Sequence, residues 1–351
     1  MKAPILTLYS SLHSTSRFLA PLISVSLNSL GSPFIRSDPF RLSHSPFTMA
    51  ACVHSSTPPQ TDDPLFNTYK KFCMPNYSKT HNDDLWLAMK DEARSDIDQE
   101  PILGNYYFTS ILSHDSLEIA LANYLSMKLS GSSFSSGALC DLILGVLTED
   151  QEIIRAVNCD LRAVKERDPA CISYVNCFLN FKGFLAIQAH RIAHNLWSNG
   201  RRILALLIQS RVSEVFAVDI HPRAKIGRGI LLDHATGVVI GETAVIGNNV
   251  SILHNVTLGG TGKASGDRHP KIGDGVLIGA GTCVLGNVVI EDGAKIGAGS
   301  VVLKRVPART TAVGNPARLI GGKENPVKLV RMPSLTMDQT LHLSEWSDFV
   351  I

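Results

Sequence analysis

The sequence lacks several features that would mark particular classes of protein. Its seven cysteines are an odd number and form no CxxC pair, which argues against a disulfide framework or a cysteine zinc site and fits a reducing compartment. No apolar stretch approaches the roughly 20 residues that a membrane span needs. The net charge of +2, without any lysine or arginine run, gives no indication of a nucleic-acid partner. With 351 residues, 44% of them hydrophobic, the chain can still bury a sizeable core.

What the sequence does contain is a six-residue period between residues 219 and 313. An aliphatic residue returns at nearly every sixth position: Ile220, Ile226, Leu232, Ile240, Ile246, Ile252, Leu258, Ile272, Ile278, Val284, Ile290, Ile296 and Val302. A helix needs apolar spacing near 3.6 and a strand needs a spacing of two, so this period favours a parallel β-helix. We therefore predict a stack of short strands and corners over residues 217–316.

The period slips at two places, after Leu232 and after Leu258. The interrupting sequences are LDHATGVV and GGTGKASGDRHPK, and they carry His234, Lys263, Arg268, His269 and Lys271. Loops that interrupt a rigid scaffold are frequent carriers of function. We expect the chemistry of this domain to lie in these two insertions.

The residues outside the repeat divide into four parts. Residues 1–48 are rich in serine and threonine with a single acid, which is typical of an organelle transit peptide. Residues 49–82 are predicted to be a polar linker, and initiation at Met49 would give a shorter cytosolic product. Residues 83–216 show helical periodicity and predict an all-α domain, with its longest helix from about Tyr174 to Trp197. Residues 317–351 have no periodicity and are predicted to be an extended C-terminal tail.

Two histidines in that long helix, His190 and His194, lie four residues apart on one helix face. This spacing can bind zinc. The intervening Arg-Ile-Ala, however, lacks the glutamate of an HExxH motif. We interpret the pair as structural packing.

A family resemblance rests on the elements RDPA (167–170), DIHP (219–222), LDHATG (232–237) and GDRHPKI (266–272). Together with the terminal WSDFVI, they resemble the serine O-acetyltransferases of cysteine biosynthesis, the plant members in particular, over about residues 83–351. The resemblance implies an α+β fold in which a helical oligomerisation domain precedes a left-handed parallel β-helix. It also implies trimers, paired into hexamers, that transfer acetyl from acetyl-CoA to L-serine.

That reaction needs a base to take the proton from the serine hydroxyl as it attacks the thioester. The resemblance makes His234 this base and Asp219 the carboxylate that orients its ring. No serine or cysteine nucleophile accompanies His234, and Cys283 occupies a repeat position. Direct attack is therefore expected rather than an acyl-enzyme.

The resemblance also assigns the contacts to serine. Arg268 and His269 would bind its carboxylate, for which a guanidinium fork is suited. Asp168 and Asp233 would receive its ammonium group. Because Asp168 belongs to the helical domain, such a site would lie between domains or subunits. L-Cysteine differs from serine at one atom and is expected to compete there as a feedback inhibitor.

For acetyl-CoA, the resemblance points to five small residues: Gly260, Thr261, Gly262, Ala280 and Ala298. The glycine-rich stretch does not fit a Walker loop, which would need glycine in place of Thr257 and serine or threonine in place of Ala264. In the family it covers the pantetheine arm, and a backbone oxyanion donor is expected there. The two alanines would let CoA lie between neighbouring prisms. Neither a permanently bound cofactor nor a metal is expected.

The last residues, Phe349, Val350 and Ile351, combine apolar side chains with a terminal carboxylate, a form suited to a carboxylate-binding pocket. In the family this tail binds O-acetylserine (thiol) lyase in the cysteine synthase complex. A regulatory scaffold for the lyase, with weak activity of its own, is one alternative function. A hexapeptide enzyme for another small acceptor is a second, including a zinc carbonic anhydrase built on His234, His254 and His269. The transit-peptide composition favours the chloroplast stroma, with the mitochondrion or cytosol as alternatives.

Overall fold

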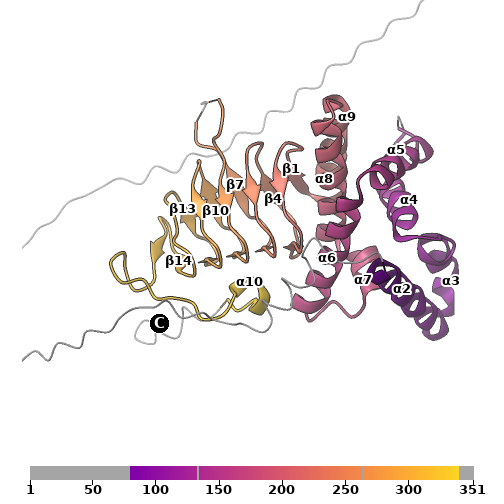
Figure 1. The fold of residues 1–351 in the computed structure, drawn as a ribbon, viewed down its shortest axis with the longest axis horizontal. Helices are drawn as coiled ribbons and strands as arrows, with labels where there is room; N and C mark the ends of the chain where they lie inside the picture. The colour runs from indigo at the N-terminus through magenta and orange to yellow at the C-terminus, as the bar shows by residue number, and fades with distance from the viewer. Residues whose placement is uncertain (1–79, 133, 263–264, 340–351) are drawn as a thin grey trace, which may run out of the picture. The chain divides into compact units, whose positions relative to one another are not determined.

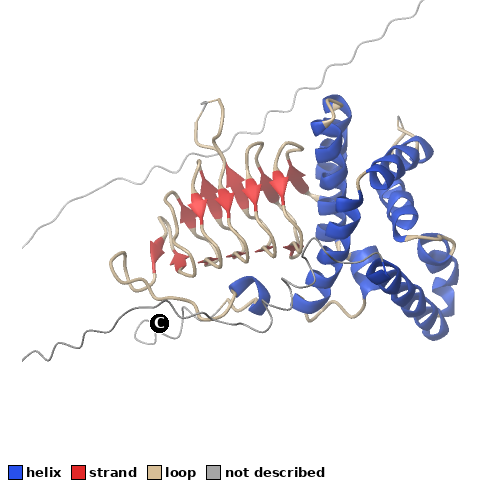
Figure 2. Ribbon diagram, viewed as in Figure 1, coloured by secondary structure: helices blue, strands red, loops and turns tan. Residues whose placement is uncertain are grey.

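The computed structural model describes residues 80–132, 134–262 and 265–339 (Figure 1). These residues belong to one compact unit, which spans residues 59–351, and form helices followed by a stack of short strands (Figure 2). The interpretations placed on residues 1–79 and 340–351 lie outside the described residues. Within the described ranges, no helix combines the length and apolar character that crossing a bilayer requires.

The helical part packs around one apolar core. Its elements are α2 (Thr80–Gln99), a 3-10 turn (Pro101–Leu103), α3 (Gly104–Tyr107), a π turn (Phe108–Leu112), α4 (Leu117–Leu129), α5 (Ser136–Glu149), α6 (Gln151–Arg167), α7 (Tyr174–Asn180), α8 (Lys182–Ser198) and α9 (Arg202–Phe216). The hydroxyls of Ser116, Ser135 and Ser173 cap the starts of α4, α5 and α7. Among the described residues, the first helix is α2, which begins at Thr80, inside the residues expected to be linker.

The prediction of one helix from Tyr174 to Trp197 was wrong. The chain breaks at Phe181, whose φ of −85° and ψ of 98° are extended, and α7 and α8 lie on either side of it. Buried residues such as Leu179 and Phe184 continue on both sides of the break, so the apolar pattern does not reveal it. The break lets α8 turn onto the first coil of strands, which it contacts at β3.

The strands form three sheets, because every third strand stacks on the one before. They are β1 (Val218–Ile220), β2 (Lys225–Ile226), β3 (Leu231–Leu232), β4 (Val238–Ile240), β5 (Val245–Ile246), β6 (Ser251–Ile252), β7 (Thr257–Gly259), β8 (Lys271–Ile272), β9 (Leu277–Ile278), β10 (Cys283–Leu285), β11 (Val289–Ile290), β12 (Lys295–Ile296), β13 (Val301–Val302), β14 (Thr311–Val313) and β15 (Arg318–Leu319). The first sheet is β1-β4-β7-β10-β13, the second is β2-β5-β8-β11, and the third is β3-β6-β9-β12-β14-β15.

The register of these sheets confirms the predicted fold class of helical domain and parallel β-helix. Repeat residues pair with one another, as Ile252 does with Ile278 and Ile278 with Ile296, and all three are fully buried. All the named strand pairs are parallel except β14 with β15. Both insertions stay outside the stack, and the second rises above β7 as a loop (Figure 1). The coils form a prism whose corners carry the polar residues.

A buried ion pair joins the helices to the first coil. The guanidinium of Arg191 lies 2.7 Å from a carboxylate oxygen of Asp160, and both side chains are almost completely buried. The other oxygen of Asp160 accepts from the N–H of Ile230 at 2.8 Å, while Arg191 also donates to the carbonyl of Gly227. A buried pair needs such further hydrogen bonds to offset its desolvation. These contacts fix α6 and α8 against the prism.

The outer face of the third sheet is covered by the chain after the prism. Ser251, Leu277 and Lys295 alternate with inward aliphatic residues and so face outward, yet they are buried. The covering segment includes α10 (Pro333–Thr336), whose Ser334 carbonyl accepts from the hydroxyl of Ser251 at 3.0 Å. Burial lowers the pKa of Lys295, and the charge of Asp338 opposes this effect. The part of the expected extended tail that the structure describes is therefore packed against the prism.

Candidate active site

Two columns of corners carry the predicted site residues. The histidine edge comprises corners 233–237, 253–256, 279–282 and 297–300, which lead from the third sheet to the first. The arginine edge comprises corners 221–224 and 241–244 and the loop 260–270, which lead from the first sheet to the second. The two edges flank the first sheet. Backbone hydrogen bonds stack the histidine edge, for example from Gly281 to the carbonyl of His254 and from Gly299 to that of Ala280.

On the histidine edge, His234 projects into solvent from the first insertion. Its side chain is 76% exposed, and Nε2 lies 3.8 Å from a carboxylate oxygen of Asp233. The His254 ring lies 5.8 Å away, edge to face. The backbone of His234 and Ala235 has φ of 55° and 59°, the left-handed region that few non-glycine residues adopt. An exposed imidazole held at a turned-out corner is suited to proton transfer.

A second carboxyl group, that of Asp168, lies close enough to Asp233 to affect its charge. Burial raises the pKa of Asp233, and the neighbouring charge of Asp168 raises it further, while His234 and His254 lower it. Asp168 is the C-cap residue of α6, and its Oδ1 accepts from the N–H of Ala170 at 2.8 Å. The structure thus brings three predicted site residues, one from the helices and two from the prism, into one group.

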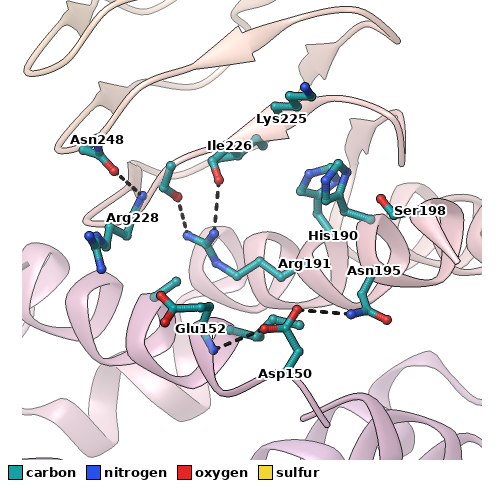
Figure 3. A pocket seen from close by; sticks show the side chains of 14 residues that line it. Asp150, Glu152, His190, Arg191, Asn195, Ser198, Lys225, Ile226, Arg228 and Asn248 are labelled. Atoms are coloured by element: carbon teal, nitrogen blue, oxygen red, sulfur yellow. Dashed lines mark hydrogen bonds between the residues drawn. The ribbon is translucent and has the colours of Figure 1, made fainter. Parts of the chain in front are cut away.

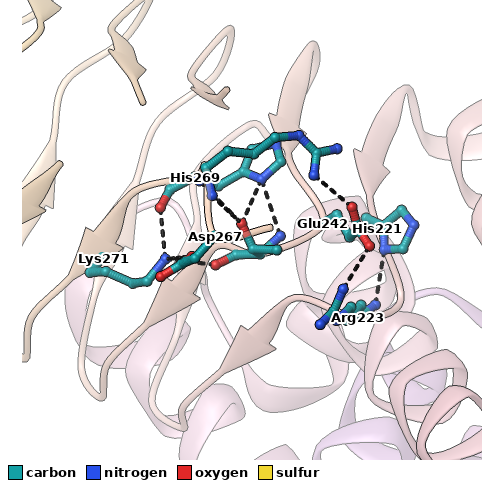
Figure 4. Close-up of polar contacts among 8 residues, drawn as sticks. His221, Arg223, Glu242, Asp267, His269 and Lys271 are labelled. Atoms are coloured by element: carbon teal, nitrogen blue, oxygen red, sulfur yellow. Dashed lines mark hydrogen bonds and ion pairs between the residues drawn. The ribbon is translucent and has the colours of Figure 1, made fainter. Parts of the chain in front are cut away.

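Arg268 and His269 lie on the arginine edge instead, in the loop between β7 and β8. Figure 4 shows His269 there, near Glu242. The guanidinium of Arg268 donates to Glu242 at 2.8 Å, and Arg223 donates to the other oxygen of that carboxylate at 2.9 Å. These hydrogen bonds lower the pKa of Glu242 to about 2. Burial, followed by the charge of Arg268, lowers the pKa of His269, so its ring is neutral at neutral pH. The edge offers a cation and a neutral imidazole side by side.

Asp219 lies on the first sheet, between the two edges. Its Oδ1 accepts from the side-chain amide of Gln209, on α9, at 2.7 Å. Among the residues that the structure describes, no hydrogen bond or ion pair joins Asp219 to His234, so a single chain does not form the predicted dyad. Nor do His234, His254 and His269 converge as a zinc site would require, because His269 occupies the other edge.

The five residues predicted to contact CoA are also divided. Gly260, Thr261 and Gly262 are exposed at the start of the loop on the arginine edge, with Gly262 at a φ of 72°. Ala280 and Ala298 stand on adjacent corners of the histidine edge. A Cβ on Gly279 would lie 2.6 Å from the N–H nitrogen of Ala298, so these coils approach closely there. Neighbouring coils of the histidine edge therefore pack closely at these two alanines.

A pocket of about 520 Å³ lies elsewhere, between α6, α8 and the first coil (Figure 3). None of the predicted site residues lines it. His194 Nδ1 lies 2.8 Å from the carbonyl of Pro222, and His190 is buried and bonded to the carbonyl of Ala224. Burial lowers the pKa of His190. The two histidines therefore brace α8 against the first corner, in agreement with their interpretation as structural packing.

Sequence reasoning missed the partners on the arginine edge. Glu242 and Thr243 follow Ile240-Gly241 as ordinary corner residues, and Arg223 is a single cation in another corner. Nothing in the six-residue period distinguishes them from other polar corners. The available signal is their position one coil below Arg268 and His269, which becomes visible only when the repeat register is stacked.

The chain is similar to known proteins over almost all of the described region. The family model "Serine acetyltransferase, N-terminal" matches residues 85–189, "Hexapeptide repeat of succinyl-transferase" matches 228–254, and "Bacterial transferase hexapeptide (six repeats)" matches 269–304. Serine acetyltransferase 1, chloroplastic, of Arabidopsis thaliana is 66% identical over 314 residues, which are 86% of this chain and 100% of the relative. Serine acetyltransferase 3, mitochondrial, of the same plant is 71% identical over 269 residues, covering 77% of this chain and 69% of the relative.

Solved structures agree with these matches. Soybean serine acetyltransferase complexed with serine is 62% identical, with a TM-score of 0.68, and the match covers 69% of this chain and 100% of the soybean chain. Serine acetyltransferase in complex with coenzyme A from Brucella abortus is 45% identical, also with a TM-score of 0.68, over 72% of this chain and 100% of the bacterial one. From the match to the complete chloroplastic relative, the chain belongs to the serine acetyltransferase family of acyltransferases.

Proposed function

We propose that the protein transfers the acetyl group of acetyl-CoA to the hydroxyl of L-serine, giving O-acetyl-L-serine and CoA. The observation that carries the proposal is the group on the histidine edge, where the exposed imidazole of His234 stands beside Asp233 and the charge of Asp168 acts on the same carboxyl. Such a group offers a base for a hydroxyl and a binding place for an ammonium at the same point. Relatives solved with serine and with coenzyme A support both substrates.

In the proposed mechanism His234 takes the proton from the serine hydroxyl as the oxygen attacks the thioester carbonyl. The tetrahedral intermediate then collapses, the carbon–sulfur bond breaks, and the imidazolium returns its proton to the CoA thiolate. Asp219 would orient the His234 ring and stabilise its charged form. Backbone N–H groups of Gly260, Thr261 and Gly262 would lie against the thioester oxygen. Ala280 and Ala298 would line the path of CoA.

The ammonium of serine would bind between Asp168 and Asp233. The charge of Asp168 is part of why the pKa of Asp233 is raised, because like charges repel. A cation between them removes that repulsion. Arg268 and His269 would bind the serine carboxylate, and Glu242 occupies only one donor of a guanidinium that has five.

We infer that the complete site forms between neighbouring chains. The groups that would hold the two ends of serine lie on different edges of one prism, whereas a cyclic trimer sets one edge of each prism against another edge of its neighbour. Residues 217–316 would then be the catalytic domain, and residues 83–216 would pair the trimers. In that assembly Asp219 of one chain would approach His234 of another.

We further propose that the protein acts in the chloroplast, that L-cysteine inhibits it, and that its tail binds a partner enzyme. A relative was solved in complex with cysteine, which supports L-cysteine as a competitive inhibitor. Residues 1–48 would be the transit peptide and 49–82 a linker, in keeping with the chloroplastic relative, although the mitochondrial relative is also similar. Phe349, Val350 and Ile351, outside the described residues, would bind O-acetylserine (thiol) lyase.

The substrate proposal is tested by measuring CoA release with L-serine against a panel of other amines and alcohols. The His234→Ala variant is expected to lose about 10²–10⁴ in kcat, the contribution of a general base. A drop of less than about tenfold would show that another group takes the proton. A wild-type enzyme that prefers a different acceptor would overturn the choice of serine.

The proposed tail contact is tested by removing residues 342–351. We expect the shortened chain to keep its rate of serine acetylation and to lose binding to the lyase in a sedimentation or pull-down assay, because the anchor lies in the tail. Intact binding would dispose of the tail as anchor. A shortened chain that loses acetylation as well would favour a different role for these residues.

A further inference from the structure

Thr243 lies at the centre of the contacts that join the corner of one coil to Arg268 and His269 of the next. Its hydroxyl oxygen is 2.9 Å from Nδ1 of His269, and its backbone nitrogen is 3.2 Å from the same atom. The hydroxyl oxygen also accepts from the backbone N–H groups of Arg268 and His269, at 3.0 and 3.1 Å. Figure 4 shows how His269 and Glu242 lie in this network. One side chain thus contacts both residues proposed to bind the serine carboxylate.

These contacts determine where the proton of the His269 ring resides. A backbone N–H can only donate, so Nδ1, which receives the N–H of Thr243, must be the unprotonated nitrogen. The hydroxyl can then donate to Nδ1 or to the neighbouring Asp267 carboxylate, and its two lone pairs take the two backbone donors. In the neutral ring the remaining proton lies on Nε2.

The space around the ring is equally specific. A Cβ on Gly241 would lie 2.0 Å from Cδ2 and 2.1 Å from Nε2 of His269, so the ring needs glycine at this corner. A Cβ on Gly260 would lie 3.4 Å from Nε2, which places that nitrogen beside the first residue of the loop. His269 is only 6% exposed. The ring is therefore held in one position, with an N–H donor on the side of the loop.

We propose that Thr243 is a positioning residue for substrate recognition, which holds His269 as the Nε2–H tautomer and fixes the backbone of residues 268 and 269. The inference rests on the proposed function, in which Arg268 and His269 bind the serine carboxylate. An Nε2–H donor attracts a carboxylate oxygen, whereas the other tautomer would present a lone pair and repel it. Thr243 would thereby select α-amino acids over amino alcohols that lack the carboxylate.

The test compares L-serine with ethanolamine, which has the hydroxyl and the ammonium but no carboxylate. In Thr243→Val the hydroxyl is lost and the shape is kept. We expect KM for serine to rise about tenfold, the effect of one buried hydrogen bond, with KM for acetyl-CoA and the rate with ethanolamine within about twofold of wild type. Thr243→Ser, which restores a hydroxyl, is expected to restore serine binding. The matched control is Thr310→Val, because Thr310 is also a corner threonine and its hydroxyl donates to the carbonyl of Pro307.

The inference is wrong if Thr243→Val and Thr310→Val have the same KM for serine, or if serine and ethanolamine lose rate in parallel. Should Thr243→Val not fold, Thr243→Ala carries the same test, because it removes the hydroxyl without adding bulk. A wild-type enzyme that does not acetylate serine would instead contradict the proposed function. The two failures are therefore distinguishable.

Discussion

At the scale of single residues, the carboxylate of Glu242 balances the positive charges of Arg268 and Arg223 on the arginine edge. Hydrogen bonds from Arg268 and Arg223 lower its pKa from 4.5 to about 2. A carboxyl group whose pKa is lower in the folded chain than in the unfolded chain stabilises the fold above its unfolded pKa. That contribution is lost as the pH falls from 4.5 toward 2. Glu242 should therefore contribute fully at neutral pH and progressively less in acid.

Replacing Glu242 by glutamine tests the direction of this pH dependence of stability. We expect Glu242→Gln to lower Tm at pH 7 by roughly 2–4 °C, as for the loss of about 1 kcal/mol from a partly exposed ion pair. The difference from wild type should shrink below pH 4.5, where the wild-type carboxyl begins to lose its advantage. Thermal unfolding followed by circular dichroism over this range measures it, with the exposed Glu324→Gln as control. A difference that does not change with pH would contradict a charge-based role.

At the scale of elements, α8 packs directly against the corner that presents His234. A Cβ on Gly183 would lie 2.1 Å from the carbonyl oxygen of Leu232 and 3.1 Å from Cβ of Ala235. Only glycine permits this approach of a helix to the prism. The helix thus supports the left-handed turn at His234 and Ala235 from behind.

We expect Gly183→Ala to force α8 and this corner apart. The cost should be about 1–3 kcal/mol of stability, as for other overpacked sites, and kcat should fall because His234 moves. Gly145→Ala in α5 is the matched control, since nothing lies within 4 Å of its added Cβ. In the control, alanine should stabilise the helix by about 0.5–1 kcal/mol. Urea unfolding and kcat measure both effects, and a Gly183→Ala enzyme as stable and active as wild type would refute the close packing.

The repeat itself could be predicted from the sequence because every coil imposes the same requirement. Ile252, Ile278 and Ile296 must each face inward for the coils to stack, and this leaves a period that is visible without a structure. The break at Phe181 left no such trace, because apolar residues continue across it. The cover over Ser251 and Lys295 was equally hidden, since residues 327–339 have no periodicity and match only an assembled sheet.

At the scale of the whole molecule, the sequence suggested the proposed site residues but not how they are divided between the two edges. Asp233 and His234 are next to each other in the chain, and so are Arg268 and His269, so each pair could be expected to act together. The edge to which each corner belongs depends on the number of residues in each coil and on the two insertions. In the proposed trimer, neighbouring chains would add a further relation that the spacing of residues does not record. The grouping of Asp168 with the histidine edge likewise required the docked helices.

In the proposed assembly, one active site uses the histidine edge of one chain and the arginine edge of another. His234→Ala and Arg268→Ala, each nearly inactive alone, can be co-expressed with different tags and purified as mixed assemblies. Random mixing within a cyclic trimer leaves both halves intact in about a quarter of the sites. A mixture of His234→Ala with Asp233→Asn, two changes on the same edge, is the control and should stay inactive.

The decisive measurement is CoA release with L-serine by the mixed His234→Ala and Arg268→Ala assemblies. If the site is shared between chains, the mixed assemblies should have about a quarter of the wild-type rate, well above that of either parent. A mixed assembly no more active than the mean of its two parents would show that each chain completes its own site, and would contradict the shared one.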